Sequence, residues 1–208
     1  MHRTMVFIDY ENFEISRKSL YTRSDSGITE NRQVPWLDIA RLPKELISLL
    51  APNYFLVKTF LFIPEPDEFL MKAEWRKKNY DFLKGLGNTD FFSVVPGRHV
   101  ARPRILGQEM EVNKSDTYFI DEKGSDVNIA VQMIVKAFHN SYDTAIVLSG
   151  DTDYIPIYDV LDSIGKTVIV VGIKGQNLSR FKSHTDKQIT LDLEFLRKCE
   201  RQDRRLTN

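Results

Sequence analysis

Short runs of apolar and β-branched residues recur along this chain and most constrain its fold. Three are almost uninterrupted, at residues 5–8, 145–148 and 167–171, and two mixed runs lie at 54–63 and 91–95. A strand with one face in water alternates apolar and polar residues, whereas an unbroken apolar run indicates a strand that is covered on both faces. These runs therefore predict a mostly parallel sheet with helices on both sides.

Helical patterns lie between these runs. Residues 126–138 are the clearest, and Asp126 suits the start of that helix because a carboxylate favours a helix N-terminus. Its expected core face is Val127, Ala130, Val131, Ile134, Val135 and Phe138. Strands that alternate with helices predict an α/β fold of three layers, α/β/α. Further helices are expected within 37–50, over 68–86 and 154–164, and from residue 193.

Length and composition fit one domain with insertions. The chain has 208 residues, of which 42% are hydrophobic, enough for one full core. We expect the domain to span residues 1–195, and a charged helix end and tail to occupy 196–208. Two segments fit the alternating pattern poorly and are predicted to be insertions. Residues 16–33 are polar and indicate a loop, and residues 96–123 indicate a hairpin or a flap.

The charge balance excludes some classes of protein. Basic and acidic residues number 29 each, so binding of nucleic acid by bulk positive charge is excluded, although a local basic patch is not. The single cysteine, Cys199, excludes an internal disulfide and a cysteine-based zinc site. None of the four histidines has metal-ligand spacing. With no membrane-length apolar run and no signal peptide, we expect a cytoplasmic protein that does not bind membranes.

Four aspartates stand where such a sheet would bring them together. Asp9 ends the first strand, Asp151 and Asp153 follow the fourth, and Asp126 opens the preceding helix. Ligands bind such sheets at the carboxyl ends of the strands. Clustered carboxylates suit Mg²⁺ or Mn²⁺, and Asn12 would orient water, phosphate or a carboxylate. Each aspartate alone is more simply a turn or helix cap, so the hypothesis depends on their combination.

Three segments carry a family resemblance: Phe7–Asn12 (FIDYEN), Lys123–Val127 (KGSDV) and Leu148–Pro156 (LSGDTDYIP). In order and spacing they resemble the NYN domain in its LabA-like (DUF88) branch, a relative of PIN-domain nucleases. The turn at residues 165–168 is also similar, and the resemblance extends from Met5 to Leu193. It implies a PIN-like α/β/α sandwich that cleaves phosphodiester bonds, most often of RNA, with Mg²⁺ or Mn²⁺.

The resemblance also implies roles for individual residues. Asp9, Asp126, Asp151 and Asp153 would form the metal site, with Asn12 as their polar partner and with Lys123 and Ser149 beside them to orient phosphate or ligand. The residues themselves add a basic group after the fifth strand, suited to a phosphate backbone: Lys174, Arg180 and Lys182. Candidates for stacking on bases are Tyr10, Phe13 and Tyr154.

Three functions remain open at this point. The leading hypothesis is a Mg²⁺- or Mn²⁺-dependent ribonuclease acting on single-stranded or structured RNA through a metal-activated water. The second is a nucleic-acid-binding or regulatory module that keeps the acidic pocket without cleaving. The third is a phosphatase for small phosphate esters, because Asp9-Tyr10-Glu11 partly resembles the Asp-x-Asp of haloacid-dehalogenase-type phosphatases. A PIN-like domain often pairs with itself, so a homodimer is also expected.

Overall fold

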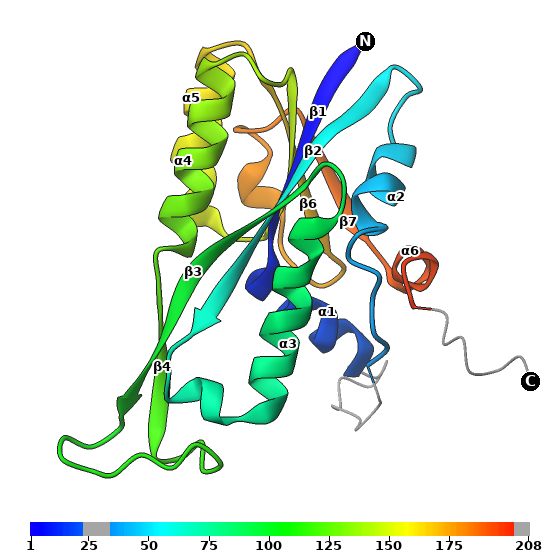
Figure 1. The fold of residues 1–208 in the computed structure, drawn as a ribbon. Helices are drawn as coiled ribbons and strands as arrows, with labels where there is room; N and C mark the ends of the chain where they lie inside the picture. The colour runs from blue at the N-terminus through cyan, green and yellow to red at the C-terminus, as the bar shows by residue number, and fades with distance from the viewer. Residues whose placement is uncertain (23–33, 202–208) are drawn as a thin grey trace, which may run out of the picture.

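The computed structural model describes residues 1–22 and 34–201, which form one seven-stranded sheet (Figure 1). The strands are β1 (His2–Asp9), β2 (Tyr54–Pro66), β3 (Phe92–Pro103), β4 (Tyr118–Lys123), β5 (Thr144–Leu148), β6 (Thr167–Ile173) and β7 (Lys187–Leu191). Their order in the sheet is β4-β3-β2-β1-β5-β6-β7, and every neighbouring pair is parallel except β3 and β4. The predicted mostly parallel sheet is confirmed.

Helices cover both faces of this sheet and complete the predicted α/β/α arrangement. In the described part of the chain they are α1 (Tyr10–Thr22), α2 (Leu42–Ser48), α3 (Glu74–Gly85), α4 (Ser125–Phe138), α5 (Ile155–Ser163) and α6 (Leu193–Lys198). Figure 1 shows α4 and α5 on one side of the sheet and α2, α3 and α6 on the other. None of these helices has the length and apolar character needed to cross a bilayer.

The two core layers follow from the alternation of side chains along each strand. In β1, Val6 and Ile8 pack into the core shared with α1, α2, α3 and α6. Met5 and Phe7 point to the opposite face and pack with α4 and α5. Because successive side chains in a strand point to opposite faces, a strand buried on both sides must be apolar at every position. This explains the unbroken apolar runs in the sequence.

The two predicted insertions, residues 16–33 and 96–123, contain regular secondary structure in the parts that the structure describes. Residues 96–123 contain the end of β3 and all of β4, which pair as an antiparallel hairpin. Residues 16–22 are the end of α1, not a loop, and residues 23–33 lie outside the described residues. This part of α1 lacks an apolar period because Arg17 takes a buried position, where its guanidinium binds Glu14 and the Pro35 carbonyl.

Helix α4 lies where the sequence predicts, but part of its expected core face is wrong. The residues that it buries are Ser125, Ile129, Met133 and Ala137. The exposed positions include Val127, Val131, Val135 and Phe138, which were expected to be buried. Apolar residues occur on both the buried and the exposed sides of this helix. Their spacing alone therefore does not identify the side that packs against the sheet. Strand β7 was missed because it is a short edge strand with mixed polarity.

An ion pair fastens the start of β1 to the segment that enters β5. The Arg3 guanidinium lies 2.6 Å from one carboxylate oxygen of Asp143, and the Arg3 backbone N–H donates to the other at 2.9 Å. A hydrogen bond with Arg3 lowers the pKa of Asp143 from 3.8 to about 2. A lowered folded-state pKa stabilises the fold fully above pH 3.8, and the effect is lost as the pH falls toward 2.

We expect Asp143→Asn to lower the free energy of unfolding at pH 7 by up to about 1 kcal/mol, because the pair is partly exposed. The difference from wild type should vanish near pH 2. Urea unfolding at a series of pH values measures this, with Asp162→Asn on the exposed side of α5 as the matched control. A difference that does not change with pH would contradict the assignment.

Candidate active site

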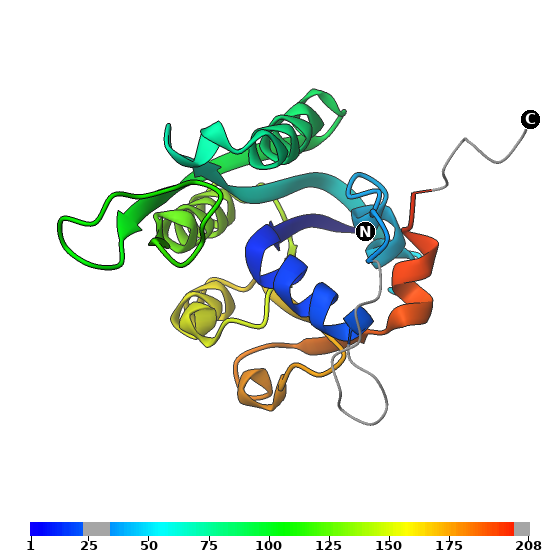
Figure 2. The ribbon, with the colours of Figure 1, turned by 90° about the horizontal axis from the view of Figure 1, so that it is seen from below.

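The strand order of the sheet reverses between the central strands β1 and β5. From β1 the chain continues to β2 and β3 on one side, whereas β5 continues to β6 and β7 on the other. Figure 2 is viewed from below Figure 1, toward the carboxyl end of β1, where α1 begins. Such a switch point leaves a crevice at the carboxyl ends of the strands, where ligands bind α/β sheets.

Asp9 lies in this crevice at the end of β1 and is 9% exposed. One of its carboxylate oxygens accepts from the Ser149 hydroxyl at 3.0 Å and the Tyr154 hydroxyl at 3.2 Å, and the other accepts from the Asn12 backbone N–H at 3.2 Å. Burial raises the pKa of Asp9 above its ordinary value although these hydrogen bonds lower it, and the charge of Asp126 raises it further. The site thus contains a buried carboxyl group surrounded by donors.

Tyr154 links Asp9 to Asp126. Its hydroxyl lies 2.7 Å from a carboxylate oxygen of Asp126 and 3.2 Å from Asp9. A phenol has one proton to donate, so the Tyr154 hydroxyl donates a hydrogen bond to one of the two carboxylates or one that is shared between them. Burial and both negative charges raise the pKa of Tyr154, which keeps it protonated. Tyr154 is 1% exposed, so the prediction that it stacks on bases is wrong, and Phe13, also 1% exposed, packs in the core.

The two remaining aspartates lie after β5. Asp151 caps the short helix η3 (Thr152–Tyr154), because its carboxylate accepts from the Asp153 backbone N–H at 2.9 Å. Asp153 is exposed. Within the described residues, no three of Asp9, Asp126, Asp151 and Asp153 bring carboxylate oxygens within 4.8 Å of one another. An octahedral ion, with oxygen ligands at about 2.1 Å, would therefore be held by these four aspartates partly through water.

A buried hydroxyl on α5, the helix that follows Asp151 and Asp153 in the chain, has no partner. Tyr158 is fully buried, and within residues 1–22 and 34–201 its hydroxyl makes no hydrogen bond. Burial raises the pKa of Tyr158, and the charges of Asp151 and Asp9 raise it further. An unpaired buried hydroxyl in this part of the fold fits a site that would hold a hydrated divalent cation.

Asn12 ties the ends of three strands together. Its side-chain oxygen accepts from the Gly150 backbone N–H at 2.9 Å and from the Gln176 amide at 3.1 Å. Gln176 in turn accepts from the Ile173 backbone N–H at 2.7 Å. The Asn12 oxygen is thus used to hold the loops. No sequence pattern marks Gln176, which lies far from Asn12 in the chain.

The predicted basic residues lie at the surface. Lys123 is 3.2 Å from Asp121 at the end of β4. Lys174 directly follows β6, and Arg180 and Lys182 lie in and just after the short helix η4 (Ser179–Phe181). All four side chains are exposed. Their charged groups are therefore accessible to an anion in solvent.

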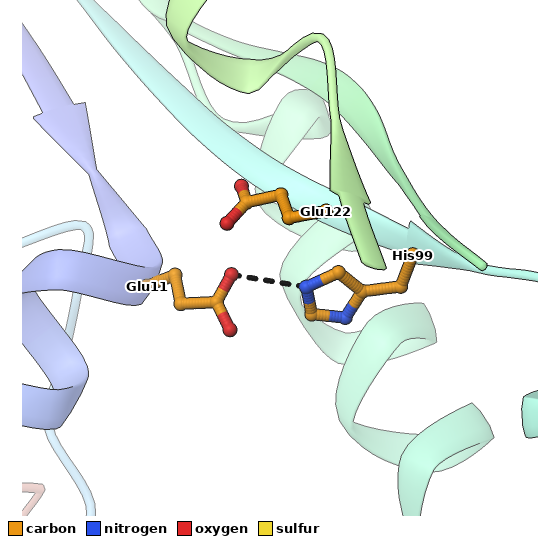
Figure 3. Close-up of side chains that lie close together, drawn as sticks. All are labelled: Glu11, His99 and Glu122. Atoms are coloured by element: carbon orange, nitrogen blue, oxygen red, sulfur yellow. Dashed lines mark hydrogen bonds and ion pairs between the residues drawn. The ribbon is translucent and has the colours of Figure 1, made fainter. Parts of the chain in front are cut away.

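A second group, which sequence reasoning missed, lies beside Asp9: Glu11 on α1, His99 on β3 and Glu122 on β4 (Figure 3). Their ligand atoms all lie within 4.8 Å of one another, and His99 Nε2 is 3.0 Å from Glu11 Oε2. Sequence spacing could not reveal the group because its members come from three separate elements.

The charges in this second group are unequal. Burial raises the pKa of Glu122 to about 7, and its hydrogen bond with Glu11 adds to this. Burial also acts to raise the pKa of Glu11, but hydrogen bonds with His99 and Glu122 outweigh it and leave the pKa below its ordinary value. Of the two carboxyl groups, Glu11 therefore ionises first, and Glu122 holds its proton to higher pH.

A cleft of about 610 Å³ opens onto Glu11 and His99. Residues of α1 and α3 line it together with two tryptophans, Trp36 and Trp75, which are 64% and 65% exposed. The Arg76 guanidinium lies 4.5 Å from the centre of the Trp75 ring. Exposed aromatic rings next to a cation are the surface on which unpaired nucleobases stack. The cleft is therefore a candidate path for substrate.

We expect Tyr154→Phe to lower the free energy of unfolding by about 1–3 kcal/mol, because the buried carboxylate of Asp9 and the exposed one of Asp126 lose their shared donor. Tyr158→Phe is the matched control. It removes a hydroxyl without a partner, so it should leave stability unchanged or raise it. Urea unfolding in EDTA measures both, and equal effects of the two variants would contradict the assigned bridge.

Comparisons with known proteins give one family match and one match of fold. The family model of the NYN domain matches residues 98–192, which include Asp126, Asp151 and Asp153 but not Asp9. A crystal structure of a protein of unknown function from Vibrio parahaemolyticus has the same fold, with a TM-score of 0.56 and 16% identity over 94% of this chain and 96% of that one. No curated protein matches the sequence. The NYN domain belongs to the PIN-like nuclease superfamily, so the match over residues 98–192 suggests a nuclease.

Proposed function

We propose that this protein is a metal-dependent nuclease that hydrolyses phosphodiester bonds of RNA, and that it belongs to the LabA-like (DUF88) branch of NYN proteins. The observation that carries the proposal is the buried Asp9 at the switch point, joined through Tyr154 to Asp126. The NYN match over the second half of the chain supports it independently. Cytoplasmic location and a homodimeric state stay predictions from the sequence.

Asp9, Asp126, Asp151 and Asp153 would hold Mg²⁺ or Mn²⁺, directly or through water. When bound, such an ion polarises the phosphate and lowers the pKa of a coordinated water. PIN-like nucleases generally use divalent metals, and the oxygen donors and the unpaired Tyr158 hydroxyl fit this requirement.

Other side chains keep these carboxylates in place. Ser149 donates to Asp9 and, through the same oxygen, accepts from the Asp151 backbone N–H at 3.2 Å, so it couples two of the aspartates. Asn12 holds the loop at Gly150, which sets the path of the chain into Asp151. Groups that are fixed in advance cost less reorganisation when charge develops on the phosphate.

Single-stranded RNA is the substrate that the surface favours. The exposed rings of Trp36 and Trp75 can stack on unpaired bases, which a duplex keeps inside its own stack. The basic residues Lys174, Arg180 and Lys182 are exposed and would contact the phosphate backbone.

The phosphatase alternative fits the site less well. Such a mechanism requires Asp9 to attack phosphorus as a nucleophile, but Asp9 is 9% exposed and both of its carboxylate oxygens accept hydrogen bonds. Glu11, which would act as the second acid of that motif, is paired with His99. These contacts favour a role for Asp9 as an anchor within the pocket.

We expect Asp126→Asn to reduce cleavage of labelled single-stranded RNA at least about a hundredfold, the size typical for loss of one group that stabilises the transition state. Asp126 is exposed, so the variant should fold normally. EDTA should abolish wild-type cleavage, and Mg²⁺ or Mn²⁺ should restore it.

Asp90→Asn, on the exposed turn before β3, is the matched control and should cleave as the wild type does. Equal cleavage by wild type and Asp126→Asn would contradict the proposal. Binding of RNA without cleavage in either metal would favour the alternative of a binding module.

We expect Lys174→Gln, Arg180→Gln and Lys182→Gln together to weaken binding of single-stranded RNA. The plot of log affinity against log salt concentration should lose about 0.7 in slope for each phosphate contact removed. Fluorescence anisotropy in EDTA measures this without cleavage. The control is Lys77→Gln with Lys78→Gln on the exposed face of α3, and an equal loss of slope there would contradict the assignment.

A further inference from the structure

We propose that Glu11, His99 and Glu122 form a second cation site, separate from the aspartate pocket, that selects a divalent transition-metal ion such as Zn²⁺ or Mn²⁺ over Mg²⁺. Three side chains from α1, β3 and β4 point toward one space (Figure 3). The proposal does not depend on the nuclease assignment, because it concerns different residues and is tested by binding of metal alone.

The pairing of β3 with β4 places two of the three ligands. His99 and Glu122 lie directly opposite each other in the antiparallel register. Directly opposite residues in such a pair carry their side chains on the same face of the sheet, with Cβ atoms about 5 Å apart. The backbone hydrogen bonds of the hairpin thus fix the distance between the imidazole and the carboxylate.

The connection from β1 to α1 supplies the third ligand. Glu11 is the second residue of α1, immediately after the chain leaves β1 at Asp9. Its carboxylate reaches His99 Nε2 at 3.0 Å. The position of Glu11 is therefore set by the central strand, and that of the other two ligands by the edge of the sheet.

The ligand chemistry separates this group from the aspartate pocket. Carboxylates alone suit Mg²⁺, whereas an imidazole nitrogen suits Zn²⁺ and other transition ions. Of two such ions at a mixed site, Zn²⁺ binds more tightly than Mn²⁺ in the usual order of affinities. Three protein ligands leave further coordination positions for water or substrate, as in open zinc sites.

Ser125 provides an independent sign that a ligand is expected here. It is 6% exposed, and within the described residues its hydroxyl has no hydrogen-bond partner of good geometry. Ser125 follows Glu122 by three residues, at the turn from β4 into α4. A buried hydroxyl left unpaired beside three metal-ligating side chains is placed to bind a water on the ion.

A close contact keeps Ser125 in that position. A Cβ atom on Gly97 would lie 2.2 Å from the Ser125 hydroxyl and 3.2 Å from its backbone nitrogen. Only glycine lets β3 approach the start of α4 so closely. Gly97 lies two residues before His99, so the same approach brings the hydroxyl to the hairpin that carries His99 and Glu122.

Calorimetric titration of metal-free protein with Zn²⁺, Mn²⁺ or Mg²⁺ alone tests the proposal. The Asp126→Asn background weakens the aspartate pocket and isolates the second site. We expect one Zn²⁺ to bind there, with Mn²⁺ weaker and Mg²⁺ weakest. His99→Gln and, separately, Glu122→Gln should each lower the affinity for Zn²⁺ at least about tenfold. Co²⁺ as a probe should show an absorption spectrum that changes in the His99→Gln variant.

His184→Gln is the matched control, because His184 also contacts a carboxylate, that of Asp159 at 2.6 Å, without a third ligand nearby among the described residues. Its affinity for Zn²⁺ should equal that of the background protein. Glu122 is exposed, so Glu122→Gln keeps the test valid if His99→Gln folds poorly. Unchanged Zn²⁺ affinity in Glu122→Gln, or an equal loss in His184→Gln, would overturn the proposal.

Discussion

Asp9 carries a carboxylate into the interior at the end of the central strand, and burial of a charge costs free energy unless hydrogen-bond donors or a cation surround it. The chain meets this demand with donors from three places: the backbone of α1, Ser149 after β5, and Tyr154 in η3. These contacts hold the carboxyl ends of β1 and β5 together. The crevice at the switch point is thus held by the same atoms that make it acidic.

Two groups of different chemistry share this edge of the sheet. The first, around Asp9 and Asp126, offers oxygen atoms and hydroxyl donors. The second offers an imidazole with two carboxylates and opens onto an aromatic cleft. They are adjacent because Glu11 follows Asp9 by two residues and Glu122 precedes Asp126 by four. A substrate that lies across this edge can therefore meet both.

Much of the fold could be predicted because unbroken apolar strands report burial on both faces. The edges of the sheet could not: β7 is short and mixed in polarity, and β4 belongs to a hairpin whose register the sequence does not encode locally. Because this register could not be predicted, neither could the position of His99 opposite Glu122. The order of the motifs placed Asp9 and Asp126 near each other, but the bridge by Tyr154 depends on packing that no spacing shows.

Gln176 shows how closely distant parts of this chain are fitted. A Cβ on Gly150 would lie 2.4 Å from its side-chain nitrogen, and one on Gly172 would lie 3.0 Å from its oxygen. The glutamine side chain thus fills the space above Gly150, in the loop after β5, and shares the space above Gly172, on β6, with Leu178, which a Cβ on Gly172 would meet at 2.7 Å. In evolution these positions should vary together: a chain that gains a side chain at 150 must carry a smaller residue at 176, and one that gains a side chain at 172 must carry smaller residues at 176 and 178. Such coordinated replacement would distinguish chains that keep this crevice from those that share only its aspartates.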